Sequence, residues 1–399
     1  MDDVFGLGTT DPTSADFYVR PDYFEVLARL RAEAPVHEFA PGMWCLTCYD
    51  DVRRVSSHPE QFCSGRGAIV NDPLRSAPSA QAGAPSILMM DPPEHGQHRH
   101  LVNRRFTPRA VGPMEPRVRE LARSVLERAP AGEELDFVEE LSAPFPLLVI
   151  AELLGIEEGD RSDFRRWSDA TIETPDRTSD DTMTAMTEFF GFLQQHIADK
   201  RAAPGGDLVS LLVSSEVDGR SLTTGELFSF LLTLLVAGNE TTRHLLTGGA
   251  VALSEHPDQR AALASAPEGL PGAVEECLRW VTPVHAFCRT PTEDLDVGGV
   301  PVAAGDYLVM LYASANRDES VFGPTADRFD VTRPVQPTHL AFGFGEHLCL
   351  GASLARLEAR VFFEELLSRY PAYEVLGPPV RVPSTIVASV AELPVRLVP

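Results

Sequence analysis

One long apolar segment limits the possible folds of this chain more than any other feature. Thr223 and Glu226 form a capping box, which marks the start of a helix, and Pro257 marks its end. Apolar residues recur at helical spacing between these signals, so the sequence predicts a single helix over Thr224–Glu255. At 1.5 Å per residue such a helix is about 48 Å long. An apolar helix of this length must run through the core of the protein.

The middle of this predicted helix is unexpectedly polar. Asn239, Glu240, Thr241 and Thr242 follow directly after Gly238. Several of these residue types form helices poorly, and burying their polar groups costs free energy. The segment is either a solvent-facing stripe on an ordinary helix or a functional site, and these residues alone leave both hypotheses open.

The periodicity elsewhere is also mainly helical. Most segments in the middle of the chain carry apolar residues at helical spacing. Strand-like alternation is confined to Met43–Tyr49 and Leu295–Tyr312, where Gly298-Gly299 can turn a hairpin. We find no internal repeat. The sequence therefore predicts one mainly α domain over residues 1–399, with a minor β region.

The charge and the cysteine content exclude several classes of protein. The chain carries 58 Asp and Glu against 34 Lys and Arg, a formal net charge of -24, so nucleic acid and anionic membranes would repel it. Six cysteines in 399 residues are too sparse for a disulfide scaffold. The start lacks a signal-peptide pattern, and the longest apolar stretch is too short to span a bilayer. We expect a cytoplasmic protein with no nucleic-acid partner and no membrane span.

Cys349 lies in the most informative segment of the chain. It follows a glycine-rich stretch and stands where the helical periodicity of LCLGASLARLEARVFFEELL begins. The positive end of a helix dipole and the free backbone N–H groups there lower the pKa of a thiol and favour thiolate. A thiolate serves as a nucleophile or as a metal ligand. The alternative is a buried structural cysteine, which is common in helical cores.

The order of residues in FGFGEHLCLG makes that alternative unlikely, because it resembles the haem-binding loop of the cytochrome P-450 superfamily of haem-thiolate monooxygenases. The matching positions are Phe342, Gly343, Gly345, His347, Cys349 and Gly351. The resemblance implies haem b as cofactor, Cys349 as its iron ligand, and the other matching residues around it. It also implies a single triangular helical domain with small antiparallel sheets around a buried haem.

Two further segments match the same family. Ala237–Thr242 resembles the dioxygen-binding turn of the family's long central helix. The resemblance implies that Glu240 and Thr241 are catalytic and deliver protons, and that Ala237 and Gly238 lie beside the cofactor.

Glu276 and Arg279 match the family's Glu-x-x-Arg pair. Their spacing places both side chains on one helical face, where they can pair. The resemblance implies that the pair is structural and is joined by a later arginine, for which Arg328 and Arg333 are the candidates.

A segment beginning at Asp91 resembles the family's haem-propionate helix. His95 and Arg99 are four residues apart, so they share a helix face and can reach one carboxylate. The resemblance implies that Arg289 and His339 hold the other propionate.

Histidines at His95, His98 and His100 admit a second interpretation, since such clusters can bind zinc. The zinc-protease order His-Glu-x-x-His is absent, which disfavours this hypothesis. We interpret Cys45 and Cys48 as structural, because no second Cys-x-x-Cys accompanies them.

Electrons must come from a separate protein. The chain has neither a Gly-x-Gly-x-x-Gly turn nor a cysteine pattern for an iron-sulfur cluster. The resemblance implies a ferredoxin and a ferredoxin reductase as donors. An acidic ferredoxin could dock on a basic stretch, although a merely solvated helix face explains the same residues almost as well. The stretch consists of His98, Arg99, His100, Arg104, Arg105 and Arg109.

The resemblance implies a monooxygenase that inserts one atom of dioxygen into a lipophilic small molecule, such as a steroid, a terpenoid or another natural product. The pocket would be lined from 62–90 and 160–197, where the apolar candidates are Ile69, Val70, Ile87, Leu88, Met89, Met90, Phe189, Phe190 and Phe192. A peroxide-driven haem-thiolate peroxygenase and a non-catalytic haem-binding sensor are the alternatives. Glu240 and Thr241 favour the monooxygenase.

Overall fold

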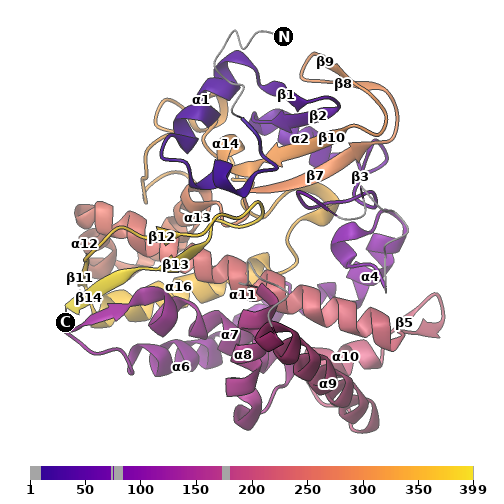
Figure 1. Ribbon diagram of the computed structural model, residues 1–399. Coiled ribbons are helices and arrows are strands. Elements are labelled where there is room, and N and C mark those ends of the chain that lie inside the picture. The colour runs from indigo at the N-terminus through magenta and orange to yellow at the C-terminus, as the bar shows by residue number, and fades with distance from the viewer. Residues whose placement is uncertain (1–9, 73–74, 76–83, 173–179, 399) are drawn as a thin grey trace.

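Helices make up most of the structure, and the longest of them, α11, crosses its middle (Figure 1). The computed structural model describes residues 10–72, 75, 84–172 and 180–398. The helices are α1 Tyr23–Glu33, α2 Tyr49–Ser57, α4 Glu94–Asn103, α5 Pro108–Val111, α6 Glu115–Leu126, α7 Pro144–Leu154, α8 Arg161–Ile172, α9 Asp180–Ala202, α10 Leu208–Val213, α11 Thr224–Glu255, α12 Pro257–Ser265, α13 Leu270–Val281, α14 Tyr312–Ala315, α15 Glu319–Phe322 and α16 Ala352–Arg369. The prediction of a mainly α protein is confirmed.

The strands are short and gather in small sheets. They are β1 Val36–Ala40, β2 Met43–Leu46, β3 Phe62–Cys63, β4 Glu134–Asp136, β5 Glu216–Val217, β6 Arg220–Ser221, β7 Ala286–Pro291, β8 Leu295–Val297, β9 Val300–Val302, β10 Tyr307–Leu311, β11 Ala372–Val375, β12 Val380–Arg381, β13 Val390–Glu392 and β14 Pro394–Val398. The largest sheet has the order β1-β2-β10-β7-β3. Its pairs are antiparallel except β2 with β10, which run parallel.

Helix α11 has the bounds that the sequence predicts. The hydroxyl of Thr223 accepts a hydrogen bond from the backbone N–H of Glu226 (3.2 Å), and the Glu226 carboxylate accepts one from the N–H of Thr223 (2.8 Å). Two orphan donors of the first turn are thereby satisfied. At the other end, Pro257 starts α12.

Strand β10 lies at the centre of the largest sheet and is buried throughout. Its side chains alternate between two cores: Val309 packs in the cluster that contains residues of α1, and Leu308 in the cluster that contains residues of α2. The predicted hairpin is confirmed as β8 and β9, which Gly298 and Gly299 join with positive φ angles of 58° and 84°.

The prediction that strands are confined to two stretches is wrong. Strands β1, β3 and β7 complete the largest sheet, and β11 and β14 pair near the C-terminus. Strand β7 has the sequence AFCRTP, and five of its six residues are buried, polar ones included, so it shows no alternation of apolar and polar residues. Periodicity alone therefore does not identify it as a strand.

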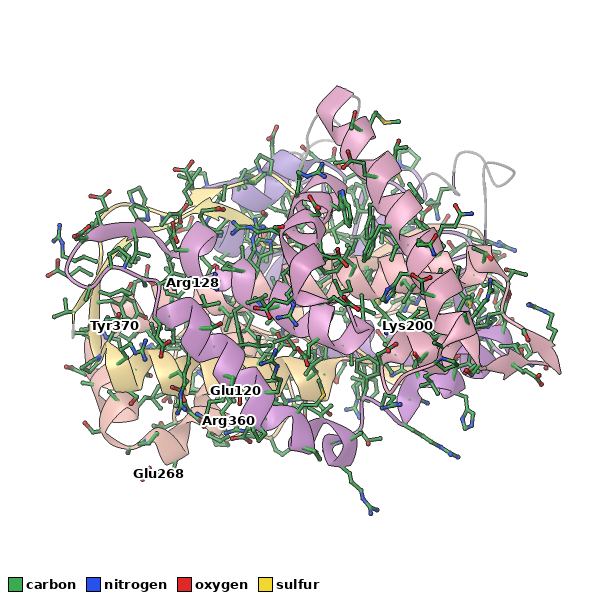
Figure 2. All side chains as sticks on the ribbon, turned by 90° about the horizontal axis from the view of Figure 1, so that it is seen from below. Glu120, Arg128, Lys200, Glu268, Arg360 and Tyr370 are labelled. Atoms are coloured by element: carbon green, nitrogen blue, oxygen red, sulfur yellow. The ribbon has the colours of Figure 1, made fainter. Side chains whose placement is uncertain are left out.

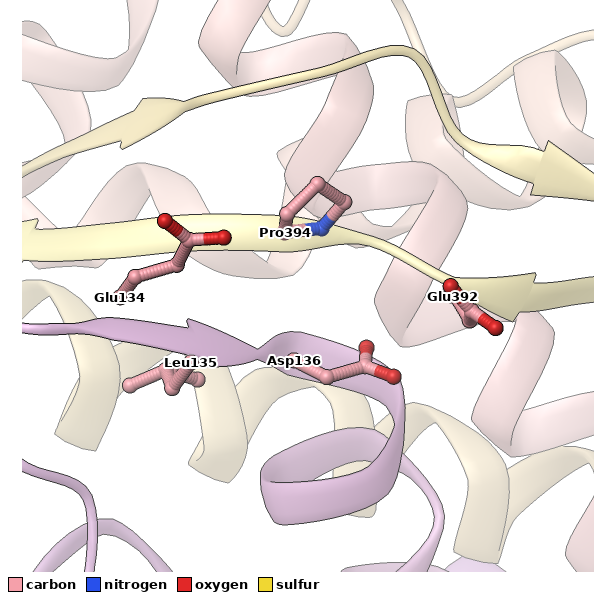
Figure 3. Close-up of a pocket in the computed structure, with 5 residues that line it drawn as sticks. All are labelled: Glu134, Leu135, Asp136, Glu392 and Pro394. Atoms are coloured by element: carbon pink, nitrogen blue, oxygen red, sulfur yellow. The ribbon is translucent and has the colours of Figure 1, made fainter.

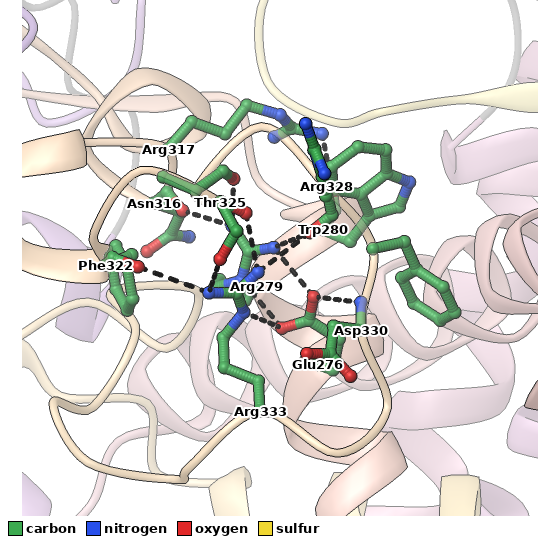
Figure 4. Close-up of polar contacts among 12 residues, drawn as sticks. Glu276, Arg279, Trp280, Asn316, Arg317, Phe322, Thr325, Arg328, Asp330 and Arg333 are labelled. Atoms are coloured by element: carbon green, nitrogen blue, oxygen red, sulfur yellow. Dashed lines mark hydrogen bonds and ion pairs between the residues drawn. The ribbon is translucent and has the colours of Figure 1, made fainter.

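Glu276 and Arg279 form a buried network that braces α13 (Figure 4). Arg279 makes two hydrogen bonds of 2.7 Å to the Glu276 carboxylate and three more to main-chain carbonyl oxygens within 316–328. Of the two candidate arginines, Arg333 is the one that joins, with Nε 3.1 Å from Glu276. Arg328 contributes only its carbonyl oxygen, and its side chain is exposed.

Helix α16, which follows Cys349, is fixed to α6 by a ladder of ion pairs. Arg360, labelled in Figure 2, lies 2.8 Å from Glu364 and also contacts Glu115. Arg119 of α6 reaches Glu365 at 2.8 Å. The ladder holds the helix behind the cysteine loop in a defined position.

None of the described helices is both long and apolar enough to cross a membrane. A surface hollow of about 420 Å³ opens between β4, β13 and β14 (Figure 3). Glu134, Asp136 and Glu392 line it together with Leu135 and Pro394, and none of the motif residues reaches it.

Candidate functional site

The cysteine loop is a tight turn ahead of α16. The backbone N–H of Cys349 donates to the carbonyl of Phe342 (2.8 Å) and closes the loop. Gly345 has a φ of +72°, and a Cβ there would lie 2.1 Å from the carbonyl oxygen of Ser56. Only glycine fits that position, which explains the glycine in the motif.

Cys349 is a free thiol with accessible surface, although it lies deep among protein atoms. Burial raises the pKa of the Cys349 thiol, and this effect outweighs the lowering caused by the backbone N–H groups of Gly351 and Ala352 and by the charges of Arg99 and Arg356. The backbone N–H groups at the start of the helix lower this pKa as expected, but the expected net shift toward thiolate is wrong for the protein alone. Desolvation is the larger effect, and a thiolate here requires a bound cation.

A cluster of positive and imidazole side chains lies next to the loop. Arg99 donates to the carbonyl of Leu348 (2.5 Å), and the rings of His95 and His347 are 4.1 Å apart. Arg289 is only 5% exposed, and the single hydrogen bond of its guanidinium within the described residues goes to the neighbouring carbonyl of Cys288.

The electrostatics of this cluster are unbalanced. Burial and the charges of Arg289, His95 and Arg99 lower the pKa of His347 to about 3. Burial likewise lowers the pKa of His95, whose Nδ1 lies 2.6 Å from Glu346. The cluster thus holds two arginines and one carboxylate, Glu346, in a chain whose overall charge is strongly negative. The cluster suits an anionic ligand.

His339 lies apart from this cluster. Its Nε2 is 3.3 Å from Oε2 of Glu275, and its Nδ1 accepts a hydrogen bond from the N–H of Ala341 (3.1 Å). Glu275 is also bound by Arg356. The structure therefore brings together three of the four side chains expected to bind the propionates, His95, Arg99 and Arg289. His347 lies beside them, at the place that the resemblance implied for His339.

The polar segment of α11 divides between two faces of the helix. Ala237 is exposed and Thr241 is half-buried, and the Thr241 hydroxyl donates to the carbonyl of Ala237 (2.7 Å). Asn239, Glu240 and Thr242 are buried. The hypothesis of a solvent-facing stripe is therefore wrong. We call the side with Ala237 and Thr241 the open face of α11.

Glu240 is paired within its own helix. Nε2 of His244 lies 3.0 Å from its carboxylate and Nη1 of Arg243 lies 3.2 Å away. Burial raises the pKa of Glu240, but the hydrogen bond from His244 and the electrostatic interactions with His244 and Arg243 lower it by more, so the net shift is downward. The sequence analysis missed both partners, although their i+3 and i+4 spacing from Glu240 is a readable signal.

The three histidines of α4 do not converge. His95 points to Glu346, Nδ1 of His98 bonds to the carbonyl of Glu94 (3.0 Å), and His100 is exposed. Within the described residues no cluster of three metal-binding side chains occurs. These contacts contradict the zinc hypothesis.

The apolar candidates for the substrate pocket separate by burial. Phe189 is 1% exposed and packs on Trp167, whereas Phe190 is exposed and stacks on Phe228 (4.3 Å). Residues 73–74 and 76–83 of the expected pocket loop lie outside the described residues.

The described end of this loop reaches α11. The hydroxyl of Ser86 is 2.9 Å from that of Thr233, one turn before Ala237. The next residues, Ile87–Met89, form a 3-10 helix and are half-buried. This contact holds apolar side chains near the open face of α11.

The basic stretch is smaller than the sequence suggests. His98 is buried, and Arg99 is committed to the cysteine loop. Exposed side chains remain at His100, Arg104, Arg105 and Arg109. We call these four the basic patch. None of them forms an ion pair with another described residue.

Comparisons with known proteins agree with these features. Residues 270–384 match the family model described as cytochrome P-450. The chain is 38% identical to linalool 8-monooxygenase of Pseudomonas putida, covering 98% of this chain and 99% of the relative, and 37% identical to steroid C26-monooxygenase of Mycobacterium tuberculosis, covering 98% and 97%. The structure of CYP109Q5 from Chondromyces apiculatus superposes with a TM-score of 0.87 at 35% identity, over 98% of this chain and 99% of the other.

Proposed function

Because this chain belongs to the cytochrome P-450 family, whose members hold haem b through a cysteine thiolate, we propose that Cys349 is its iron ligand. The chain is an oxidoreductase that incorporates oxygen into its substrate. One observation supports the assignment of the ligand above all others: an accessible free thiol in a glycine-shaped loop lies next to a cluster of side chains suited to carboxylates.

The residues present fit this cofactor. A thiolate at Cys349 needs a cation, and the ferric ion of haem supplies one. Arg289 is buried without a carboxylate partner in the described structure, so it can take one propionate together with His347. His95 and Arg99 can take the other, since Nδ1 of His95 is engaged by Glu346 and Nε2 is the remaining ring nitrogen.

Haem with a thiolate ligand supplies the dioxygen chemistry, because the thiolate donates electron density that favours cleavage of the O–O bond. The chain supplies position and protons. Thr241 lies on the open face of α11, where its hydroxyl oxygen can accept a hydrogen bond, or donate one to a ligand by giving up the bond to the Ala237 carbonyl. Glu240 takes and releases protons one residue away. Ala237 leaves space beside Thr241.

We infer that the substrate is a lipophilic small molecule such as a terpenoid or a steroid. The half-buried residues Ile87–Met89 near the open face are apolar, and pockets lined in this way favour apolar ligands. The relatives named above act on linalool and on steroids. Screening such compounds by the spin-state shift in the absorption spectrum tests this inference directly.

Replacing Thr241 by alanine should uncouple electron consumption from product formation. The hydroxyl that guides protons is lost, so we expect product per electron pair to fall about tenfold or more while electron consumption continues. Thr242→Ala, which changes a buried neighbour on the other face, is the matched control. If the enzyme is normally driven by peroxide, the Thr241→Ala variant should keep its turnover with added peroxide. Unchanged coupling in Thr241→Ala would favour that alternative.

We propose that the electron donor is an acidic ferredoxin, reduced by a ferredoxin reductase, and that it docks on the basic patch. These cations are exposed and form no ion pair in the described structure. The N–H···O bond from Arg99 to Leu348 joins the same helix to the cysteine loop, so the patch lies close to the proposed iron ligand.

Reversing the charge at Arg104 and Arg105 should slow reduction by the ferredoxin about tenfold at low ionic strength, and salt should reduce the difference. Substrate affinity should stay unchanged. Arg128→Glu is the control. Arg128 is also exposed, but it lies away from the basic patch, because its neighbour Glu127 pairs with Arg369 at the end of α16 that is far from the cysteine loop. Equal reduction rates in both variants, measured by stopped-flow absorption, would exclude docking at this patch.

A further inference from the structure

Three charged or titratable residues of α11 form a buried cluster, and the family motif specifies only the first of them, Glu240. Glu240, Arg243 and His244 are 4%, 3% and 1% exposed. Oε2 of Glu240 lies 3.0 Å from Nε2 of His244, and Oε1 lies 3.2 Å from Nη1 of Arg243. All three belong to one turn of one helix, so their relative positions depend little on the rest of the fold.

The two carboxylate oxygens of Glu240 have different surroundings. Oε2 accepts a hydrogen bond from the imidazole of His244. Oε1 is fully buried and has no hydrogen-bond partner in the described structure, because the nearby Nη1 of Arg243 contributes charge without hydrogen-bond geometry. A buried oxygen with a free lone pair is the atom at which this carboxylate can bind a proton or a water molecule.

His244 has no other hydrogen bond in the described structure. Its Nδ1 is buried and unpartnered. The groups that face it are Glu240 and Arg243 from its own helix and His285 from the segment before β7, while Arg381 of β12 lies near His285. Burial, with smaller contributions from Arg381 and His244, lowers the pKa of His285 to about 3, so His285 is neutral near pH 7. The bond to Glu240 is therefore the interaction that His244 contributes to the site.

We propose that His244 is a positioning residue for proton delivery: its Nε2–H fixes Oε2 of Glu240 and leaves Oε1 as the atom that receives and releases each proton. The inference rests on the proposed role of Glu240. In each cycle Oε1 accepts a proton from water and passes it on through water toward the Thr241 hydroxyl, so the carboxylate returns to its ionised form. The Nε2 proton stays on His244 throughout.

The test compares two variants of the haem-loaded enzyme. His244→Gln keeps an N–H donor at the same helical position, whereas His244→Leu keeps the bulk and removes the donor. We expect His244→Leu to raise the fraction of electrons lost as hydrogen peroxide about tenfold and to enlarge the solvent isotope effect on product formation. His244→Gln should stay within about twofold of the parent enzyme. Equal coupling in the parent and the Leu variant, or equal uncoupling in both variants, would overturn the proposal.

Glu240→Gln separates the two levels of the hypothesis. If Glu240→Gln is fully coupled, the proposed role of Glu240 fails. If Glu240→Gln is uncoupled while His244→Leu is not, Glu240 keeps its role and only the inference about His244 fails. Both readouts are ratios of product and peroxide to electrons consumed, so a variant with less folded enzyme does not distort them.

A measurement independent of turnover is the pH dependence of thermal unfolding. The pKa of Glu240 is lowered in the folded protein, so its ionised form contributes stability above the unfolded pKa, and this contribution is lost as the pH falls through the folded pKa. Without His244, the buried Glu240 carboxylate loses the hydrogen bond that offsets the cost of its desolvation. We expect the Tm difference between the parent and His244→Leu to grow as the pH rises from about 4 to about 7. The same growth in a Glu240→Gln background would overturn the proposal.

Discussion

Replacing Cys349 by serine should abolish monooxygenase turnover and remove the strongly red-shifted Soret band of the reduced, carbon monoxide-bound protein. Serine keeps the size and the loop hydrogen bond from the backbone N–H to Phe342. It does not supply a thiolate, because a hydroxyl does not ionise near neutral pH even beside iron to the extent that a thiol does. The electronic contribution of sulfur is then lost although the fold remains.

Cys48→Ser is the matched control for this experiment. Cys48 is also a free, partly accessible thiol, but it lies at the start of α2. Its variant should retain the red-shifted band and full turnover. Retention of the band in Cys349→Ser would contradict the proposal that Cys349 is the iron ligand. A red-shifted band in the parent protein without oxidation of any lipophilic compound would favour the haem-binding sensor.

Replacing Arg279 by alanine should destabilise the protein by about 3–5 kcal/mol, which is the usual cost of breaking a buried ion pair from one side. The change leaves the Glu276 carboxylate with one arginine, Arg333, and leaves the carbonyl oxygens of Asn316 and Ala326 without the guanidinium donor. The free energy of unfolding from urea titration measures the loss. Arg328→Ala is the control and should change stability by less than about 0.5 kcal/mol, since its side chain is exposed.

The same substitution should weaken retention of haem. Asn316, whose carbonyl accepts from Arg279, also uses its side chain to bind the backbone N–H of Leu340 at 2.6 Å, just ahead of the cysteine loop. Loss of the guanidinium therefore frees the segment that supports the loop. If Arg279→Ala does not fold, Arg333→Ala tests the same network through its second arginine. A cost below about 1 kcal/mol in both variants would contradict the bracing role.

The sequence predicted correctly those elements whose signals lie within a few neighbouring residues. The capping box at Thr223 and the proline at Pro257 marked both ends of α11, and the glycine pair at Gly298 turned the predicted hairpin. Each of these features is determined by contacts within a few residues, so the sequence contains all the interactions involved.

Features that depend on long-range contacts were predicted less well. The sequence offers Arg328 and Arg333 as equal candidates for the partner of Glu276. Only the fold of residues 316–333 directs Arg333 toward Glu276. Strand β7 was missed because its two-sided burial depends on partners elsewhere in the sheet. The place expected for His339 is taken by His347, which the cysteine loop carries to the cluster around Arg289.

The long helix shows where the two kinds of information separate. The sequence alone determined that α11 exists, where it begins and ends, and that its polar centre needs an explanation, because helical periodicity and capping are local properties. Only the tertiary structure decided that Thr241 lies on an open face while Glu240 is buried beside His244. The reason is physical: periodicity places side chains around a helix, but burial depends on what packs against each face. Burial raises the pKa of the Cys349 thiol, and it is the effect on the pKa of Glu240 that the contacts with His244 and Arg243 must outweigh.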